Sequence, residues 1–217
     1  MKTPQINSSL IQKCLLPLKG NFQYLAEEEQ QEKEIHNYLI TRNIDCSTTF
    51  KAASILIPLV DIQQNNQWNI ILTKRAKHLK HHANEVSFPG GRFEKSDIDL
   101  QTTAIRETSE EIGIDKKHIK IIGKLPYQKT ISQYIITPYV AIIDPNYQIV
   151  IDYNEVEEVF LLPLEYALDH NNHQKQTQQI DNQFFSFVQL QYMEHTIWGS
   201  TARMLFQLVN RLKQFIV

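Results

Sequence analysis

The stretch of sequence that decides the fold runs from residue 86 to residue 114 and reads VSFPGGRFEKSDIDLQTTAIRETSEEIGI. It contains three of the six glycines in the whole chain, Gly90, Gly91 and Gly113. Since about 7% glycine is usual, this clustering in a glycine-poor chain indicates a backbone with special conformational requirements. Small and apolar side chains recur on one side of residues 100–113, which predicts a helix with Gly113 as its C-cap.

Three glutamates share one face of this predicted helix. Steps of three and four residues bring Glu107, Glu110 and Glu111 close together, and like charges at that spacing destabilise an isolated helix by about 0.2–0.5 kcal/mol per pair. Two interpretations are open: an ordinary solvated helix surface, or a site where hard carboxylates bind Mg²⁺ or Mn²⁺. The second is favoured by the tight turn at residues 88–91, which could bring backbone carbonyls to a metal, and by Arg106, which could orient a nearby acid.

The composition is that of a soluble globular protein with a sizeable core. The 217 residues are 42% hydrophobic and 21% charged, with 22 Lys and Arg against 24 Asp and Glu. This balance excludes the basic surface of non-specific nucleic-acid binders. No apolar run approaches the ~18 residues that span a bilayer, and the first ten residues are too polar for a signal peptide. Cys14 and Cys46 lack metal-ligand spacing, so free thiols in a reducing cytoplasm are expected.

The remaining segments alternate between strand-like and helix-like patterns. Apolar or alternating runs predict strands over residues 52–60, 68–73, 118–125, 131–143, 148–151, 156–162, 184–190 and 192–197. The first two and the last two of these strands could form hairpins. Residues 163–169 are predicted as a short helix and 171–179 as a polar loop. A C-terminal helix is indicated by apolar residues at three- and four-residue steps: Ala202, Leu205, Val209, Leu212 and Ile216.

The sum of these elements is a mixed α/β (α+β) domain over residues 49–217, in which helices cover a sheet. Residues 1–48 are predicted to be a helical extension packed on that domain, with a helix over residues 25–40. A homodimer is left open by the sequence.

The carboxylate helix resembles the Nudix box, whose family form is G-x5-E-x7-R-E-U-x-E-E-x-G-U, with U aliphatic. The matching residues here are Gly91-x5-Asp97-x8-Arg106-Glu107-Thr108-Ser109-Glu110-Glu111-Ile112-Gly113-Ile114. An Asp in place of the first Glu and a spacer one residue longer are what the coenzyme A pyrophosphohydrolase subfamily shows. Thr108 stands at an aliphatic position.

Flanking motifs resemble the same subfamily in order along residues 50–210. Upstream stand Leu72-Thr73-x-Arg75, Leu79-Lys80-x-His82 and Val86-x-Phe88-Pro89-Gly90-Gly91, with Ala76 and Asn84 replacing the usual Ser and Gly. Downstream stand Asn154-Glu155-Val156-Glu157-Glu158-Val159-Phe160 and Ile197-Trp198-Gly199-Ser200-Thr201-Ala202.

The resemblance implies a Nudix-type α/β/α sandwich with a mixed sheet between helices. It also implies hydrolysis of coenzyme A, and of acyl-CoA as a further substrate, to 3′,5′-ADP and 4′-phosphopantetheine with Mg²⁺ or Mn²⁺. Glu107 and Glu111 would be the principal metal ligands, Glu110 a ligand or a water-orienting base, and Gly91 a ligand through its carbonyl. Arg106 would pair with Asp97 and hold the loop against the helix.

Two further sets of residues enter through the resemblance. A later-loop carboxylate often assists in this superfamily, and Glu155, Glu157 and Glu158 are equal candidates. Substrate contacts are expected from the turn glycines Gly90 and Gly91, and from Arg75 and Lys80 in a basic segment that suits the 3′-phosphate of a CoA-like nucleotide. Two alternatives stay open: a Nudix hydrolase of ADP-ribose, a dinucleotide or a dNTP, and a non-catalytic nucleotide-binding Nudix module.

Overall fold

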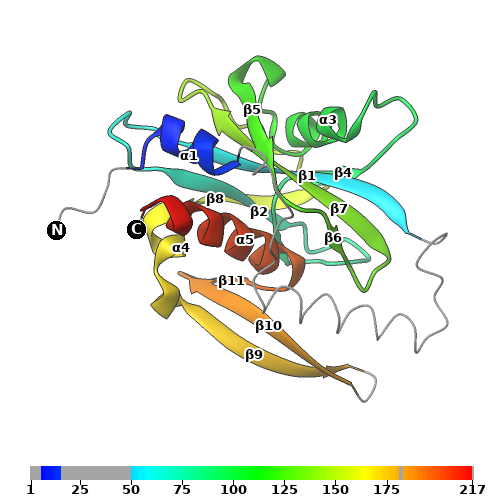
Figure 1. Cartoon of the computed structure of the whole chain (residues 1–217). Coiled ribbons are helices and arrows are strands. Elements are labelled where there is room, and N and C mark those ends of the chain that lie inside the picture. Colours follow the sequence, from blue (N-terminus) through cyan, green and yellow to red (C-terminus); the bar gives the residue numbers. More distant parts are fainter. Residues whose placement is uncertain (1–5, 16–49, 181–182, 217) are drawn as a thin grey trace.

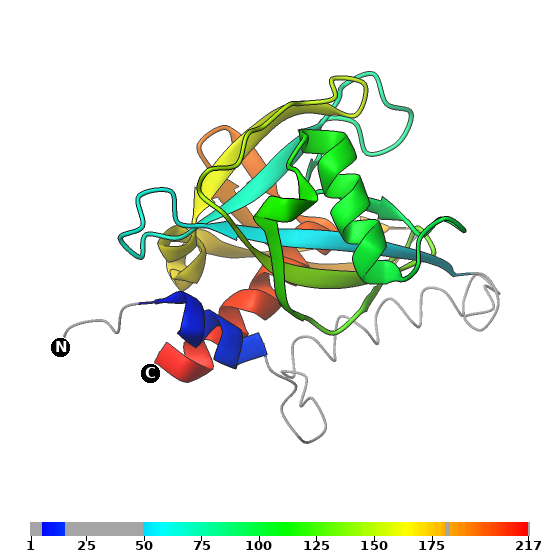
Figure 2. The ribbon, with the colours of Figure 1, turned by 90° about the horizontal axis from the view of Figure 1, so that it is seen from above.

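A computed structural model describes residues 6–15, 50–180 and 183–216 of the chain. The helix predicted over residues 25–40 and the residue Cys46 lie outside the described residues. A large sheet of eight strands forms the middle layer (Figure 1). Helix α3 lies on one of its faces, and helices α1 and α5 lie on the other (Figures 1 and 2). The predicted α/β/α sandwich with a mixed sheet is therefore confirmed.

The bounds of the elements are as follows. The strands of the large sheet are β1 (Lys51–Val60), β2 (Asn69–Arg75), β3 (Val86–Ser87), β4 (Gly90–Arg92), β5 (Ile119–Lys124), β6 (Gln128–Lys129), β7 (Tyr134–Ile143) and β8 (Val156–Pro163). A second sheet holds β9 (His173–Ile180), β10 (Gln183–Tyr192) and β11 (His195–Ile197). The helices are α1 (Ser8–Leu15), α3 (Leu100–Ile112), α4 (Leu164–Leu168) and α5 (Gly199–Ile216), with short 3₁₀ turns η1 (Lys116–His118) and η2 (His170–Asn172).

Strand β1 is the centre of the large sheet because its apolar run is buried on both faces. It pairs in parallel with β7 along nearly its whole length, from Lys51 opposite Tyr134 to Leu59 opposite Ile142. On its other side β1 is divided between two antiparallel partners. Its C-terminal end pairs with β2, as the predicted hairpin required, and residues 53–55 pair with β4. Strand β4, which contains the glycine turn, therefore lies beside β1 and in contact with α3.

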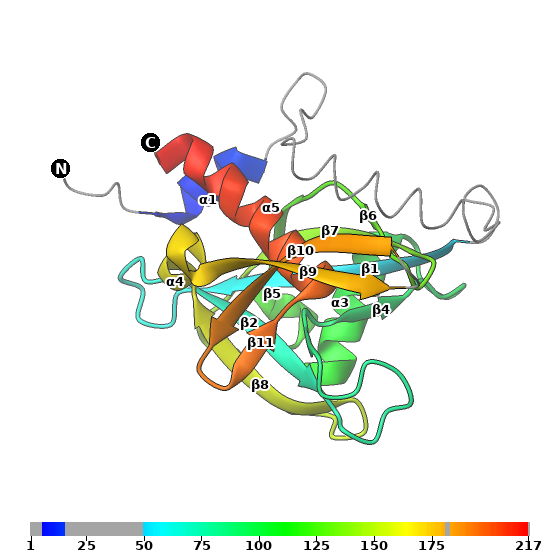
Figure 3. The same cartoon turned by 90° about the horizontal axis from the view of Figure 1, so that it is seen from below.

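Two separate hydrophobic cores cover the two faces of the sheet. The core under α3 is small and includes Leu56, Ile71, Ala104 and Ile112. The other core is larger and lies between the sheet, α1, α4, α5 and the second sheet (Figure 3). Alternate residues of β1 enter opposite cores, as expected for the two-residue period of a strand.

Two of the predictions of secondary structure are wrong. Residues 171–179 were predicted as a polar loop, but most of them form β9, which pairs with β10 from His173 opposite Leu190 to Ile180 opposite Gln183. Most described side chains of β9 are polar and exposed, so the strand has no apolar alternation to reveal it. Residues 148–151 were predicted as a strand, but they are irregular. The amides of Val150 and Asp152 instead donate to the carbonyls of Ile112 and Glu111 at 2.9 and 3.0 Å, and so satisfy the C-terminal end of α3.

Helix α1 was not predicted, and it is held by packing. Ile11, Cys14 and Leu15 are buried in the larger core, where α1 contacts α5 and β5. The indole Nε1 of Trp68 donates to the carbonyl of Ile6 at 2.9 Å, which fixes the chain before the helix. Among the described helices, none is long and apolar enough to cross a membrane.

Candidate active site

Helix α3 begins and ends where its capping residues require. The carboxylate of Asp99 accepts the amide of Thr102 at 2.7 Å, and Gly113 adopts the left-handed conformation (φ 71°) while its amide donates to Ser109. The predicted helix and its C-cap are confirmed. Thr108, at the position where the family has an aliphatic residue, is buried, and its hydroxyl donates to the carbonyl of Ala104 at 2.7 Å. The hydroxyl is therefore satisfied within the helix.

Glu111 is the most buried of the three glutamates, with only 2% of its surface exposed. One oxygen accepts the amide of Gly90 at 3.2 Å, and the other lies 3.9 Å from Nη1 of Arg75. Burial raises the pKa of Glu111 to about 8, because these two partners offset only part of the lost hydration and the charges of Glu107 and Glu155 raise it further. The carboxylate thus lies in the interior, and the guanidinium of Arg75 at 3.9 Å offsets only part of the cost of its burial.

Glu107 lies directly against the glycine turn. A Cβ atom on Gly91 would stand 2.4–2.5 Å from the carboxylate atoms of Glu107, so no other residue fits at position 91 while Glu107 keeps this place. Burial is again the main cause of a raised pKa for Glu107, opposed by the guanidinium of Arg106. Gly90, next in the turn, has φ 153°, and a Cβ there would stand 2.4 Å from the carbonyl oxygen of Ser54. Both glycines are needed for the turn to approach α3 and β1.

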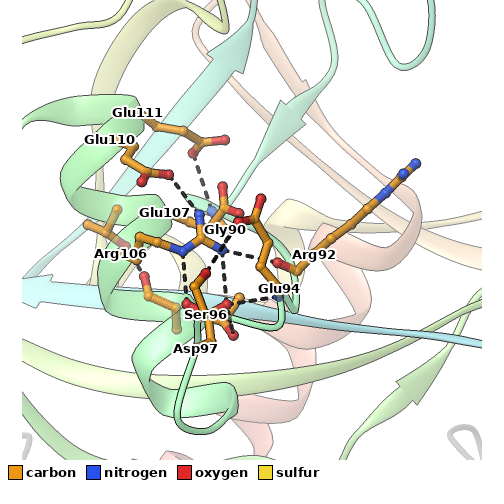
Figure 4. Close-up of polar contacts among 12 residues, drawn as sticks. Gly90, Arg92, Glu94, Ser96, Asp97, Arg106, Glu107, Glu110 and Glu111 are labelled. Atoms are coloured by element: carbon orange, nitrogen blue, oxygen red, sulfur yellow. Dashed lines mark hydrogen bonds and ion pairs between the residues drawn. The ribbon is translucent and has the colours of Figure 1, made fainter.

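Arg106 joins the loop after β4 to the helix (Figure 4). Its Nε and Nη2 atoms donate to the two carboxylate oxygens of Asp97 at 2.9 and 3.1 Å, and Nη2 also donates to the carbonyl of Arg92. This fork holds the pKa of Asp97 well below its usual range. The same guanidinium lies 3.0 Å from Glu107 and 2.7 Å from Glu110. Arg106 therefore braces the loop and fixes two of the glutamates.

The three later carboxylates have different surroundings. Glu155, just before β8, is close enough to raise the pKa of both Glu107 and Glu111. Glu157 lies 3.9 Å from the ammonium of Lys77, and Glu158 lies 3.5 Å from His195. Glu155 is thus the later carboxylate whose charge acts on Glu107 and Glu111. The sequence alone could not distinguish it from the other two.

The two predicted basic contacts are not equivalent either. Arg75 ends β2 next to Glu111, and its Nε atom is buried with no hydrogen-bond partner among the described residues. Lys80 is exposed on the loop from β2 to β3 and makes no ion pair within the described part of the chain. Asn84, which replaces a glycine of the resembled motif, adopts φ 61° in that loop. Asn tolerates the left-handed region better than most residues, which accounts for the replacement.

The arrangement fits a divalent metal ion. Glu111 is buried and Glu107 is half-buried, both have raised pKa values, and the glycine turn lies against both of them. Carboxylate and carbonyl oxygens are the ligands that Mg²⁺ and Mn²⁺ prefer. The buried and unpaired Nε atom of Arg75 adds a donor for an anionic ligand at the same place.

Comparisons with known proteins show which family this chain resembles. The model of the NUDIX domain family matches residues 51–205. A protein of Salmonella paratyphi B named "Uncharacterized Nudix hydrolase NudL" is 36% identical over 164 residues, which make up 75% of this chain and 83% of that protein. A MutT/nudix family protein from Enterococcus faecalis has a similar fold, with a TM-score of 0.51 and 14% identity over 88% of this chain and 76% of that one.

The carboxylate helix, the glycine turn and these relatives define a pyrophosphohydrolase, an enzyme that acts on phosphorus-containing acid anhydrides. The chain belongs to the Nudix family. Its activity is accordingly hydrolysis of a nucleoside diphosphate derivative, and enzymes of this family generally use divalent metal ions.

Proposed function

We propose that this Nudix hydrolase cleaves the diphosphate of coenzyme A, and of acyl-CoA, to 3′,5′-ADP and the corresponding 4′-phosphopantetheine. The observation that carries the proposal is the course of residues 72–91, the segment that resembles the CoA motif. It runs from β2 through an exposed basic loop to the glycine turn, and so joins Arg75, beside Glu111, to Lys80 and His82 on the surface. Such a segment can contact two phosphate groups at once.

The placement of Arg75 refines the role expected for it. Its guanidinium lies 3.9 Å from a box carboxylate, so we assign it to the diphosphate that is cleaved and not to the 3′-phosphate. The exposed ammonium of Lys80 is then the better candidate for the 3′-phosphate. The turn glycines keep their proposed role beside the diphosphate, because only a backbone without side chains leaves room there.

The metal would be held by Glu107, Glu111, Glu110 and the carbonyl of Gly91, with Mg²⁺ or Mn²⁺ as the ion. When bound, it would neutralise charge on the diphosphate and act as a Lewis acid. Arg106 keeps Glu107 and Glu110 in place through ion pairs of 3.0 and 2.7 Å.

A carboxylate must also orient the water that attacks phosphorus and accept its proton as the bridging P–O bond breaks. Glu155 suits this role because its charge reaches both box glutamates, while it has no ion pair with any described residue. Glu110 is the alternative, and its contact with Arg106 makes it the more restrained of the two.

Product analysis by chromatography tests the proposal. CoA, dephospho-CoA, ADP-ribose and a panel of dNTPs would each be incubated with Mg²⁺ or Mn²⁺, beside a Glu111→Gln control. We expect 3′,5′-ADP from CoA and its loss in the control. Faster cleavage of another diphosphate would refute CoA as the substrate while leaving Nudix chemistry intact. Nucleotide binding without any turnover would favour the non-catalytic module.

Two single substitutions separate the phosphate contacts. Lys80→Ala should raise the KM for CoA and leave that for dephospho-CoA nearly unchanged, because only CoA carries the 3′-phosphate. Arg75→Ala should affect both substrates equally. Equal effects of Lys80→Ala on the two substrates would contradict the assignment of Lys80.

A further inference from the structure

A second group of metal-ligating side chains lies away from the box helix, on the face of the sheet that carries the second sheet. It consists of Glu158 on β8, and of Glu194 and His195 at the hairpin between β10 and β11. One ligand atom from each of the three lies within 4.8 Å of the others. The ring of His195 on β11 stacks on that of Phe160 on β8, which brings these two strands together. Two segments that are far apart in the chain thus supply the group.

His195 is fixed before any ligand arrives. It is 4% exposed, and its ring stacks on that of Phe160 with centroids 3.9 Å apart and planes inclined by 8°. Phe160 and Glu158 are two residues apart on β8 and therefore share a face of the sheet. The stacking holds the imidazole with its Nε2 atom toward the carboxylate of Glu158. Neither ring nitrogen of this buried imidazole has a hydrogen bond to a described residue.

The distances from Nε2 suit shared coordination better than hydrogen bonding. Nε2 lies 3.5 Å from an oxygen of Glu158 and 3.9 Å from an oxygen of Glu194. Hydrogen bonds from a ring nitrogen to oxygen are typically about 2.7–3.2 Å long. Two ligands of a tetrahedral Zn²⁺, each about 2.0–2.1 Å from the ion, stand about 3.3–3.4 Å apart. Small rotations of the two glutamate side chains would reach that geometry, because both are partly or fully exposed.

The charges of the group also call for a cation. Two carboxylates and one imidazole converge, and Lys74 stands directly opposite Glu158 on β2. Lys74 makes no ion pair with either glutamate in the described structure. A divalent ion would therefore meet two carboxylates that no lysine or arginine of the described residues neutralises.

We propose that Glu158, Glu194 and His195 bind a Zn²⁺-type ion, with water as the fourth ligand. One imidazole and two carboxylates suit Zn²⁺, whereas Mg²⁺ prefers an all-oxygen octahedral set. The ion would tie β8 of the large sheet to the β10–β11 hairpin of the second sheet. The site is separate from the box glutamates, because Glu158 lies on the opposite face of the sheet from α3.

The test is a metal titration of the whole chain after treatment with a chelator, in an excess of Mg²⁺ that occupies the box. Zn²⁺ affinity would be measured by calorimetry, and Co²⁺ would replace Zn²⁺ to report tetrahedral coordination by visible absorption. The site variants are Glu158→Gln and His195→Gln. Glu158→Gln is the safer of the two, since its side chain is partly exposed while His195 is packed in the core. The controls are Glu157→Gln, a neighbour on β8 that pairs with Lys77, and Glu111→Gln in the box.

We expect one equivalent of Zn²⁺, a visible Co²⁺ spectrum, and at least a ~10-fold loss of affinity in Glu158→Gln. Both controls should bind as the unchanged chain does. Absence of Zn²⁺ binding would overturn the proposal and leave an ordinary histidine–carboxylate contact. Binding that survives both site variants would also overturn it, as would binding that is lost in Glu111→Gln.

Discussion

Replacing Glu111 by Gln removes a carboxylate that the fold buries before any metal is bound. The folded pKa of Glu111 is about 8, against 4.5 for the ordinary side chain. The native state therefore keeps a proton that the unfolded chain releases, between about pH 4.5 and 8. By linkage, the free energy of unfolding must fall as the pH rises through this window. The amide of the Glu111→Gln variant cannot ionise, so that protein should not share the fall.

The size of the effect follows from the two pKa values. A tenfold difference in proton affinity corresponds to about 1.36 kcal/mol, so between pH 5 and pH 9 the metal-free chain should lose about 4 kcal/mol through this group. The groups that face it are Arg75 on β2 and the amide of Gly90, which lower the pKa, and Glu107 and Glu155, which raise it. The folded pKa of about 8 already includes these opposing contributions. Glu111→Gln should therefore be the more stable protein at pH 9 in the presence of a chelator.

Urea denaturation at intervals from pH 5 to pH 9 measures this directly. The unchanged chain should lose stability with pH in chelator and regain it in Mg²⁺, since a ligand at 100 times its Kd adds about 2.7 kcal/mol. Glu111→Gln should show neither the loss nor the gain. The matched control is Glu110→Gln, an exposed glutamate on the same helix, which should keep the pH dependence. Parallel profiles of the unchanged chain and Glu111→Gln in chelator would mean that the buried carboxylate is ionised in the native state, and would refute the expected pH dependence.

Three other substitutions have expected outcomes. Gly91→Ala should leave stability nearly unchanged but lower kcat on the order of 10²-fold, because the added Cβ displaces only the flexible end of Glu107; activity assays and thermal melts check both parts. Gly90→Ala should instead lower the free energy of unfolding by at least about 1–3 kcal/mol, because the left-handed backbone and the main-chain carbonyl of Ser54 cannot move aside for a Cβ atom. Equal melting temperatures for Gly90→Ala and Gly91→Ala would contradict this difference. Asp97→Asn should cost about 1.5–3 kcal/mol at pH 7, because Arg106 loses its charged partner in the loop and keeps only its ion pairs with Glu107 and Glu110. The lowered pKa of Asp97 stabilises the fold above about pH 4 and ceases to do so as the pH falls through the folded value. Asp97→Asn should therefore show a flatter acid limb in urea denaturation, and an unchanged limb would argue against the bracing ion pair.

The parts of the fold that were predicted correctly depend on local signals. Helix α3 carries its own N-cap, its apolar positions and its C-cap glycine within 15 consecutive residues, from 99 to 113. The apolar runs of β1 and β2 are long enough for each strand to be predicted on its own. Strand β9 carries mostly polar, exposed side chains in the described residues, and its existence depends on main-chain pairing with β10. A polar strand that forms through main-chain pairing has no apolar alternation in its sequence, and this is why the sequence predicts a loop where β9 lies.

The same limit applies to the candidate site. The box residues are neighbours in sequence, so their proximity could be predicted. Arg75, Glu155 and the box meet only because β2 and β8 pair side by side at the edge of the sheet. Arg75 and Lys80 belong to one basic segment of the sequence, and only the fold separates the one beside Glu111 from the one on the surface.

The carboxylates of this region divide into two kinds that their sequence positions do not distinguish. Asp97 finds every partner it needs within the protein: two bonds from Arg106, one from the Glu94 amide and one from the Thr103 hydroxyl. Its pKa is lowered, and it needs nothing from outside to be ionised. Glu111 is buried and Glu107 is half-buried, each has fewer partners than Asp97, and their pKa values are raised. A protein that buries a carboxylate without neutralising it gives up stability, unless the missing charge arrives with a ligand. The direction of the pKa shift thus separates the acid that holds this loop in place from the two acids that we propose as metal ligands.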